Sequence, residues 1–95
     1  MTGAVLFYHS VFDDDIRKIL ERIGCTHFVE VPSAWAEDEG ERRFGTHIYP
    51  GTDSIVLAFL EAHQAETLEA EVRAWKGDKV KAHTRLALFP VETFI

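Results

Sequence analysis

Several features that mark other classes of protein are scarce in this sequence. Its 95 residues include one cysteine, Cys25, so the chain cannot form an internal disulfide, which fits a reducing compartment. No apolar run approaches the ~20 residues of a membrane-spanning helix. Residues 5–8 are too few for a signal peptide, and no basic residue precedes them. We therefore expect a cytoplasmic protein that does not insert into membranes.

Positive charge is also in deficit. Sixteen acidic residues against ten lysines and arginines give a formal net charge of −6. Such a surface repels phosphate backbones, so nucleic acid is not expected as a partner. Repeats and low-complexity segments are missing, and 46% of the residues are hydrophobic. The composition therefore predicts one folded domain, residues 1–95, with a modest core.

The sequence does contain two short runs that are almost wholly apolar, residues 4–8 and 54–60. Both are rich in branched and aromatic side chains and lack turn residues, which is typical of strands buried on both faces. The less regular runs at residues 26–31 and 84–89 predict two more strands. Pro32, which has no N–H to donate, places the first of these near a sheet edge.

Two segments show helical periodicity. One follows the acidic residues 13–15, which suit a helix start, and Gly24 is placed to end it. The other follows residues 61–64 and ends near Gly77. The apolar positions of the two helices are Ile16, Ile19, Leu20 and Ile23, then Ala65, Leu68, Val72 and Trp75.

The predicted order is strand, helix, strand, strand, helix, strand. This order predicts an α+β, ferredoxin-like βαββαβ fold: a four-stranded antiparallel sheet with both helices on one face. The topology puts the first and third strands in the centre, and these are the two apolar runs. Because no helix is left for the second face, we expect another subunit to cover it in a homo-oligomer.

One long irregular stretch, about residues 32–53, separates the second and third strands. Its charged middle, residues 37–43, is expected to be solvated and mobile, and residues 49–52 carry the Pro-Gly pair of a type II turn. Loops of this length in small domains are commonly functional. The topology brings this loop to the same end as His9, Ser10 and residues 77–81, whereas Cys25, His27 and His63 lie at the other end.

This layout resembles the PII-like signalling proteins and the related CutA-type proteins, which share a long loop between the second and third strands. The resemblance implies a trimer whose sheets surround a central axis. It also implies a loop that contacts partner proteins, and small ligands bound between the loop base and the segment after the second helix. That segment matches only part of the glycine-rich nucleotide-binding loop of PII proteins. The matching positions are Gly45, Thr46 and His47 in the loop base, then Gly77, Asp78, Lys79 and Val80.

The ligand is left open between a divalent metal ion and an adenine nucleotide. Imidazoles are common ligands of divalent metals, so His47 and His9, with His83, are the candidate metal ligands. Basic side chains, Arg42 and Arg43 with Lys79 and Lys81, offer an anion pocket between subunits. Cys25 and His27 supply only two soft-metal ligands. The predicted ligand-binding residues are His9, Arg43, Gly45, Thr46, His47, Gly77, Asp78 and Lys79.

No catalytic residue is predicted. Ser10 lies beside His9, but no acid is spaced to orient the imidazole, and the carboxylate runs are exposed rather than buried in pairs. Two alternatives remain: a small dimeric enzyme of the isomerase or monooxygenase type with an apolar pocket and a histidine acid or base, and an amino-acid-binding module of the ACT type.

The leading hypothesis is a trimeric PII-like regulator that responds to a small ligand or a metal. Ligand binding orders residues 37–43, and the ordered loop docks on a protein target such as a membrane transporter.

Overall fold

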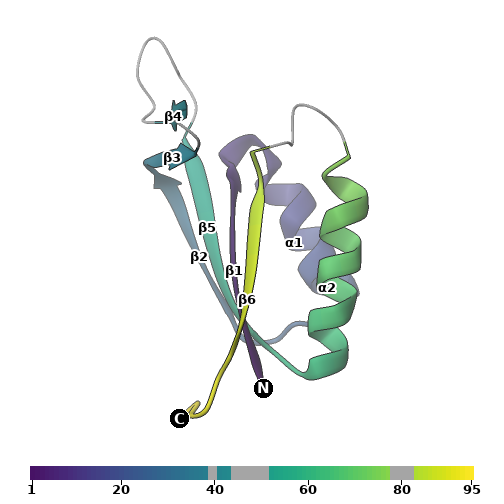
Figure 1. The fold of residues 1–95 in the computed structure, drawn as a ribbon. Helices are drawn as coiled ribbons and strands as arrows, with labels where there is room; N and C mark the ends of the chain where they lie inside the picture. Colours follow the sequence, from purple (N-terminus) through teal and green to yellow (C-terminus); the bar gives the residue numbers. More distant parts are fainter. Residues whose placement is uncertain (39–40, 44–51, 78–82) are drawn as a thin grey trace.

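Two helices lie on one face of a four-stranded antiparallel sheet, and the other face has no helix among the described residues (Figure 1). The structure is a computed structural model and describes residues 1–38, 41–43, 52–77 and 83–95. The sheet order is β2-β5-β1-β6, so the two apolar runs, β1 and β5, are its central strands. The predicted ferredoxin-like βαββαβ fold is confirmed.

The main strands and helices lie close to their predicted positions. The strands of the main sheet are β1 (Thr2–His9), β2 (Phe28–Ala34), β5 (Asp53–Leu60) and β6 (Arg85–Pro90). A 3-10 helix, η1 (Ser10–Phe12), leads from β1 into α1 (Asp13–Arg22), and α2 (Ala62–Trp75) follows β5. Neither helix of the described chain is long and apolar enough to cross a membrane.

The interior lies between the helices and the sheet. Alternate residues of each central strand point to this side and are almost fully buried, as the period of two in a strand requires. The helices contribute the apolar stripes that their sequence spacing predicts. The buried apolar residues are Ala4, Leu6, Tyr8, Ile16, Ile19, Leu20, Val56, Ala58, Leu60, Ala65, Leu68 and Val72.

The helix ends have identifiable causes. Three aspartates occupy the first turn of α1, where carboxylates complement the helix dipole. Gly24 follows α1 with φ 73°, a left-handed conformation that favours glycine. At the start of α2, Gln64 Oε1 accepts the Glu61 N–H at 2.9 Å as part of a capping box. The Gln64 amide also donates to the carbonyls of Ile23 and Gly24, at 3.3 Å and 2.9 Å, and so ties the two helices together.

The segment predicted as one irregular loop is partly strand, and this prediction was wrong in two respects. First, β2 continues through Pro32 to Ala34, with a register shift before Ala34 and Ser33 at φ 57°. Second, within the stretch expected to be mobile, β3 (Ala36–Asp38) and β4 (Glu41–Arg43) form a separate two-stranded sheet. The sequence pattern missed this hairpin because its backbone pairing needs no apolar face. The predicted turn at residues 49–51 lies outside the described residues.

The helix-free face of the sheet is apolar across all four strands. The paired residues Val29, Leu57, Val5 and Ala87 form one row across it. Leu57 remains 37% exposed and Val29 56%. Phe89 lies over Gly3, where a Cβ would overlap the ring. We call this surface the open face.

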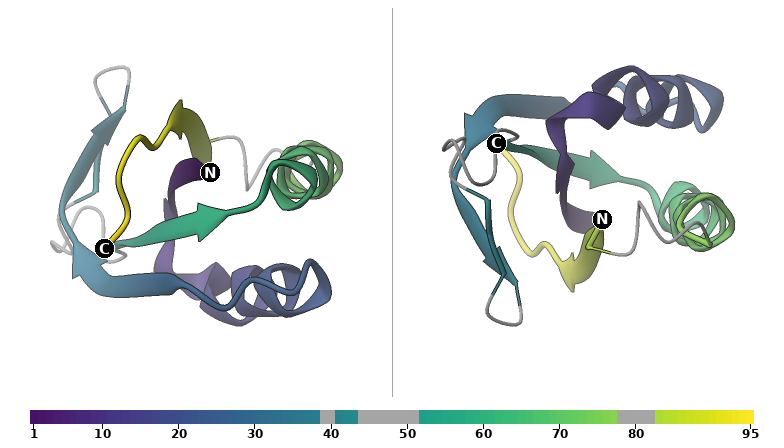
Figure 2. Two further views of the ribbon diagram at one scale, coloured as in Figure 1. Left: turned by 90° about the horizontal axis from the view of Figure 1, so that it is seen from below. Right: turned by 90° about the horizontal axis from the view of Figure 1, so that it is seen from above.

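The C-terminal residues fold back across one end of the open face (Figure 2). Val91 N–H donates to the Met1 carbonyl at 3.1 Å. Phe94 packs against Phe59, with ring centroids 4.7 Å apart, and against the edge of His27. Residues 91–95 are largely apolar, yet Phe94 is still 45% exposed. The tail therefore covers only part of the face.

Candidate functional site

The ends of four elements meet at one end of the molecule, the top in Figure 1, which we call the upper end. β1 ends there, β5 and β6 begin there, and α2 ends there, followed by Lys76 and Gly77. The described residues of the upper end are His9–Phe12 as they pass from β1 into α1, residues 52–54, residues 75–77 and residues 83–85. For the described residues, the sequence prediction that these segments meet at one end is confirmed. Residues 44–51 and 78–81 of the same prediction lie outside the described residues.

His9 is held by the turn that it starts. Its backbone is extended (φ −63°, ψ 132°), and its Nδ1 accepts the Val11 N–H at 3.1 Å. A neutral imidazole that accepts at Nδ1 carries its proton on Nε2. The ring also meets Phe12 edge-on, with centroids 6.3 Å apart. The tautomer and orientation of His9 are therefore set by local structure.

A chain of hydroxyl groups ties β1 to the start of β5. Ser10 N–H donates to the Thr52 carbonyl at 2.8 Å, and the two side-chain oxygens lie 3.1 Å apart. Ser54 Oγ donates to Ser10 Oγ at 3.1 Å, and Ser54 is fully buried. Thr52 is the first described residue after residues 44–51. The point where the chain returns from that segment is thus fixed to the end of β1.

Below this hydroxyl chain lie a buried phenol and a carboxylate. Tyr8 is fully buried, and within the described chain neither its hydroxyl nor Asp13 Oδ1 has a hydrogen-bond partner. Burial raises the pKa of Tyr8, and the Asp13 carboxylate close to the phenol raises it further. The phenol is therefore neutral at physiological pH and is unsuited to act as a base.

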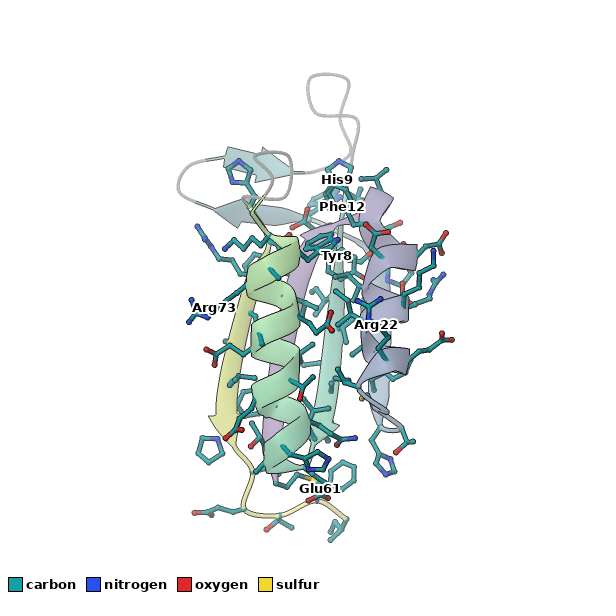
Figure 3. The ribbon with its side chains drawn as sticks, turned by 90° about the vertical axis from the view of Figure 1, so that its right-hand side faces the viewer. Tyr8, His9, Phe12, Arg22, Glu61 and Arg73 are labelled. Carbon is teal, nitrogen blue, oxygen red and sulfur yellow. The ribbon has the colours of Figure 1, made fainter. Side chains whose placement is uncertain are left out.

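The C-terminal end of α2 is anchored to the first turn of α1. Trp75 Nε1–H donates to Asp15 Oδ2 at 3.1 Å, and the indole meets the Phe12 ring edge-on with centroids 5.1 Å apart. Figure 3 shows Phe12 beside Tyr8 and His9 at this end. Because Trp75 is fixed, the chain enters Gly77 from a defined position.

The structure describes only part of the predicted ligand site. It places His9 and Gly77 at the upper end. Arg43 ends β4, in the hairpin that leaves the same end of the sheet. The other predicted residues, Gly45, Thr46, His47, Asp78 and Lys79, lie outside the described residues. A ligand-binding role for the predicted residues therefore remains a prediction.

Metal ligands do not cluster in the part of the chain that the structure describes. No group of three or more His, Cys, Asp or Glu side chains there is placed to hold a metal ion. At the lower end, Cys25 Sγ–H donates to the His27 carbonyl at 3.7 Å, and the His27 ring meets Phe94. Burial raises the pKa of the Cys25 thiol, which disfavours the thiolate that metals bind.

Sequence reasoning missed the hydroxyl chain. The sequence pattern places Thr52 at the end of a loop and Ser54 at the start of an apolar strand. A signal was present, because three polar residues, 52–54, stand at the start of an otherwise apolar run. Buried polar side chains need hydrogen-bond partners, and β1 is followed directly by the complementary serine.

No protein-family model matches the sequence, and no curated protein matches it. Several solved structures are nevertheless similar over nearly the whole chain. CPII, a nitrogen regulatory PII-like protein from Thiomonas intermedia K12 bound to ADP, AMP and bicarbonate, is 10% identical with a TM-score of 0.72. The comparison covers 97% of this chain and 88% of CPII.

Two further comparisons agree. The apo form of CPII gives a TM-score of 0.64 at 8% identity, over 94% of this chain and 92% of CPII. A PII-like signalling protein from Thermus thermophilus gives 0.62 at 11% identity, over 93% of this chain and 81% of that protein. The resemblance read from the sequence layout is thus confirmed at the level of structure: this chain has the fold of the PII-like signalling proteins.

Proposed function

We propose that this protein is a cytoplasmic PII-like regulator. It binds a small ligand at the upper end and signals to a protein partner through the segment between β2 and β5. The observation that carries the proposal is the hydroxyl chain of Ser10, Thr52 and Ser54. It fixes one base of that segment to the end of β1, at the same end of the molecule as the C-terminal end of α2. The proposed ligand would bind at this end.

An adenine nucleotide is the ligand that the comparisons favour. A protein with this fold is bound to ADP, AMP and bicarbonate in its solved structure. In this chain, the N–H groups after Gly77 and the basic residues 42–43, 79 and 81 would meet the phosphates, while residues 45–47 would form the facing wall. The net charge of −6 makes such a local basic cluster necessary for anion binding.

A divalent metal at His9 and His47 is the second candidate. The Val11 N–H donates to His9 Nδ1 and leaves the proton of the neutral imidazole on Nε2, so His9 could bind a metal only if the ring gave up this hydrogen bond or lost that proton. Either ligand would order the segment between β2 and β5, which would then dock on its target; a membrane transporter is our candidate target.

The open face supports a homo-oligomer, which we propose is a trimer. Its cross-strand row of Val29, Leu57, Val5 and Ala87 is apolar, and the tail covers only one end. A surface of this kind is stable in water when sister chains cover it. The space between sheet and helices is filled by aliphatic side chains, which favours a regulator over an enzyme with a pocket there.

Native mass spectrometry with ADP, AMP, bicarbonate and Zn²⁺, each added singly, tests the ligand and the subunit count together. Hydrogen exchange then tests the site: the bound ligand should protect residues 37–43, and His47→Ala should abolish that protection. His63→Ala, at the opposite end, is the matched control. Unchanged protection in His47→Ala would reject this site, and the absence of binding by all four compounds would reject the ligand class.

A further inference from the structure

The two edges of the sheet differ in whether they can accept another strand. Edge strands expose unpaired N–H and C=O groups, and proteins usually obstruct them with proline, bulges or charge. β2 has all three: Pro32, the register shift with Ser33 at φ 57°, and Glu30, whose carboxylate is held by Arg17 of α1 at 3.0 Å and 3.1 Å. These features obstruct regular extension of the sheet on this side.

β6 has none of these obstructions in its interior. It pairs with β1 in unbroken register from Phe7–Arg85 to Thr2–Pro90. Its one charge and its one proline are its first and last residues, and the four residues between them, LALF, are apolar. Leu88 and Phe89 are 37% and 38% exposed. Among the described residues, the outer edge of β6 pairs with no strand.

A groove runs beside this edge on the helix side. It has a volume of about 290 Å³, and Val72 of α2 with Leu86 and Leu88 of β6 forms its apolar floor. Leu86 and Leu88 share one face of β6, so side chains at alternate positions of an added strand would lie over this floor.

Basic residues at the end of α2 line the rim of the groove. Arg73 projects from α2 in Figure 3, and its Nε donates to Glu69 Oε2 at 3.1 Å. Lys76 also lines the groove, and no carboxylate of the described residues pairs with it. α2 ends and β6 begins at the upper end, so Lys76 lies toward the start of β6. On a chain with net charge −6, this cation gives the groove a local positive end.

From these observations we propose that β6 and its groove bind an extended peptide segment of a partner protein. The segment adds a fifth strand to the sheet at β6. It places alternate apolar side chains over Leu86 and Leu88, and one carboxylate at Lys76. Main-chain hydrogen bonds supply affinity, while the floor and the cation supply selectivity. The other end of the groove, at Glu69, disfavours a second acid. This docking surface reaches the upper end at Lys76, a residue to which the proposed ligand site assigns no role.

A peptide-display selection from a random library against the purified protein tests the proposal. The expected consensus alternates apolar residues and contains one acid on one side. The selected peptide, labelled with fluorescein, should show a rise in fluorescence anisotropy when it binds the protein. It should also protect the β6 amides from hydrogen exchange. Leu88→Lys places a charge on the edge and should abolish binding. Lys76→Glu should weaken it roughly three- to tenfold.

Lys18→Glu reverses an exposed charge on α1 and should leave the affinity unchanged. The proposal would be overturned if no consensus were enriched, or if the peptide protected β2 instead of β6. Equal affinity of the peptide for the Lys76 and Lys18 variants would also overturn it. So would octanoate if it protected the β6 amides as strongly as the peptide does, because the groove would then bind a small carboxylate. Protection of β6 that depends only on the concentration of the protein itself would also overturn it, because a second copy would then occupy the edge.

Discussion

Replacing Leu57 with lysine should dissociate the proposed oligomer and leave the fold intact. Leu57 lies in the middle of the open face, paired with Val5 on one side and Val29 on the other. In a single subunit its side chain is 37% exposed, so a lysine there can extend its ammonium group into water. In an assembly that covers the open face, the same ammonium group is buried beside its copies.

The size of the effect follows from these two environments. Full burial of a leucine contributes about 1.5–3 kcal/mol, so covering its exposed third contributes roughly 0.5–1 kcal/mol per subunit. An unpaired buried ammonium group costs several kcal/mol more. The substitution should therefore weaken assembly by about 3 kcal/mol or more per subunit, which is roughly a hundredfold in affinity.

Light scattering after size-exclusion chromatography measures the outcome. Wild type should elute as the oligomer and Leu57→Lys as a monomer, with the same far-ultraviolet circular dichroism. Ala70→Lys, which adds the same charge to an exposed position on α2, is the matched control and should remain assembled. An oligomeric Leu57→Lys protein, or a wild-type protein that is monomeric at high concentration, would refute the assignment of the open face to subunit contact.

Three further substitutions test the interior and its ends. Gln64→Ala removes the capping-box hydrogen bond from Glu61 N–H and the two hydrogen bonds that join the helices, and should lower the free energy of unfolding by about 2 kcal/mol in urea titrations. Gln64→Glu, which can still accept from Glu61 N–H but cannot donate, should lose about half of that. Tyr8→Phe removes a buried hydroxyl that has no partner among the described residues and should raise the free energy of unfolding by about 1 kcal/mol. If the free energy of unfolding instead fell by that amount, the Tyr8 hydroxyl would have to be hydrogen-bonded to Asp13. Burial raises the pKa of the Cys25 thiol in the folded state. The neutral thiol therefore contributes fully to the free energy of unfolding below the ordinary thiol pKa of 9.0, and this contribution is lost as the pH rises through the pKa of the folded state. Unfolding titrations should therefore show a steeper loss above that pH for wild type than for Cys25→Ser, and equal slopes would contradict the shift.

The main sheet and helices could be predicted because buried apolar residues recur in the sequence with the period of a strand or a helix. The apolar runs that became β1 and β5 are the strands that the topology makes central, and the stripes of both helices match their buried residues. The extension of β2 past Pro32 was missed because an edge strand tolerates both proline and a bulge. The β3–β4 hairpin was missed because its pairing is carried by the backbone.

The candidate site was harder to predict, since it depends on contacts between distant residues. The predicted topology placed His9 and Gly77 at a common end, but it did not predict the link from Ser10 to Thr52, which spans 42 positions. The groove beside β6 was also missed, because Lys76 and Leu86 belong to segments that are adjacent only in the folded chain. The hydrogen-bond partner of each polar group depends on the tertiary structure.

The indole of Trp75 gives the upper end an intrinsic optical signal. It is half-buried between Phe12 and Asp15, two residues before Gly77, while the chain's other tryptophan, Trp35, is 73% exposed. In a Trp35→Phe background, the emission wavelength and intensity would therefore report on the tip of α2 alone. Ligand binding at the upper end could then be followed in real time without a dye. A single stopped-flow trace would show whether the ligand binds before or after the surroundings of Trp75 change.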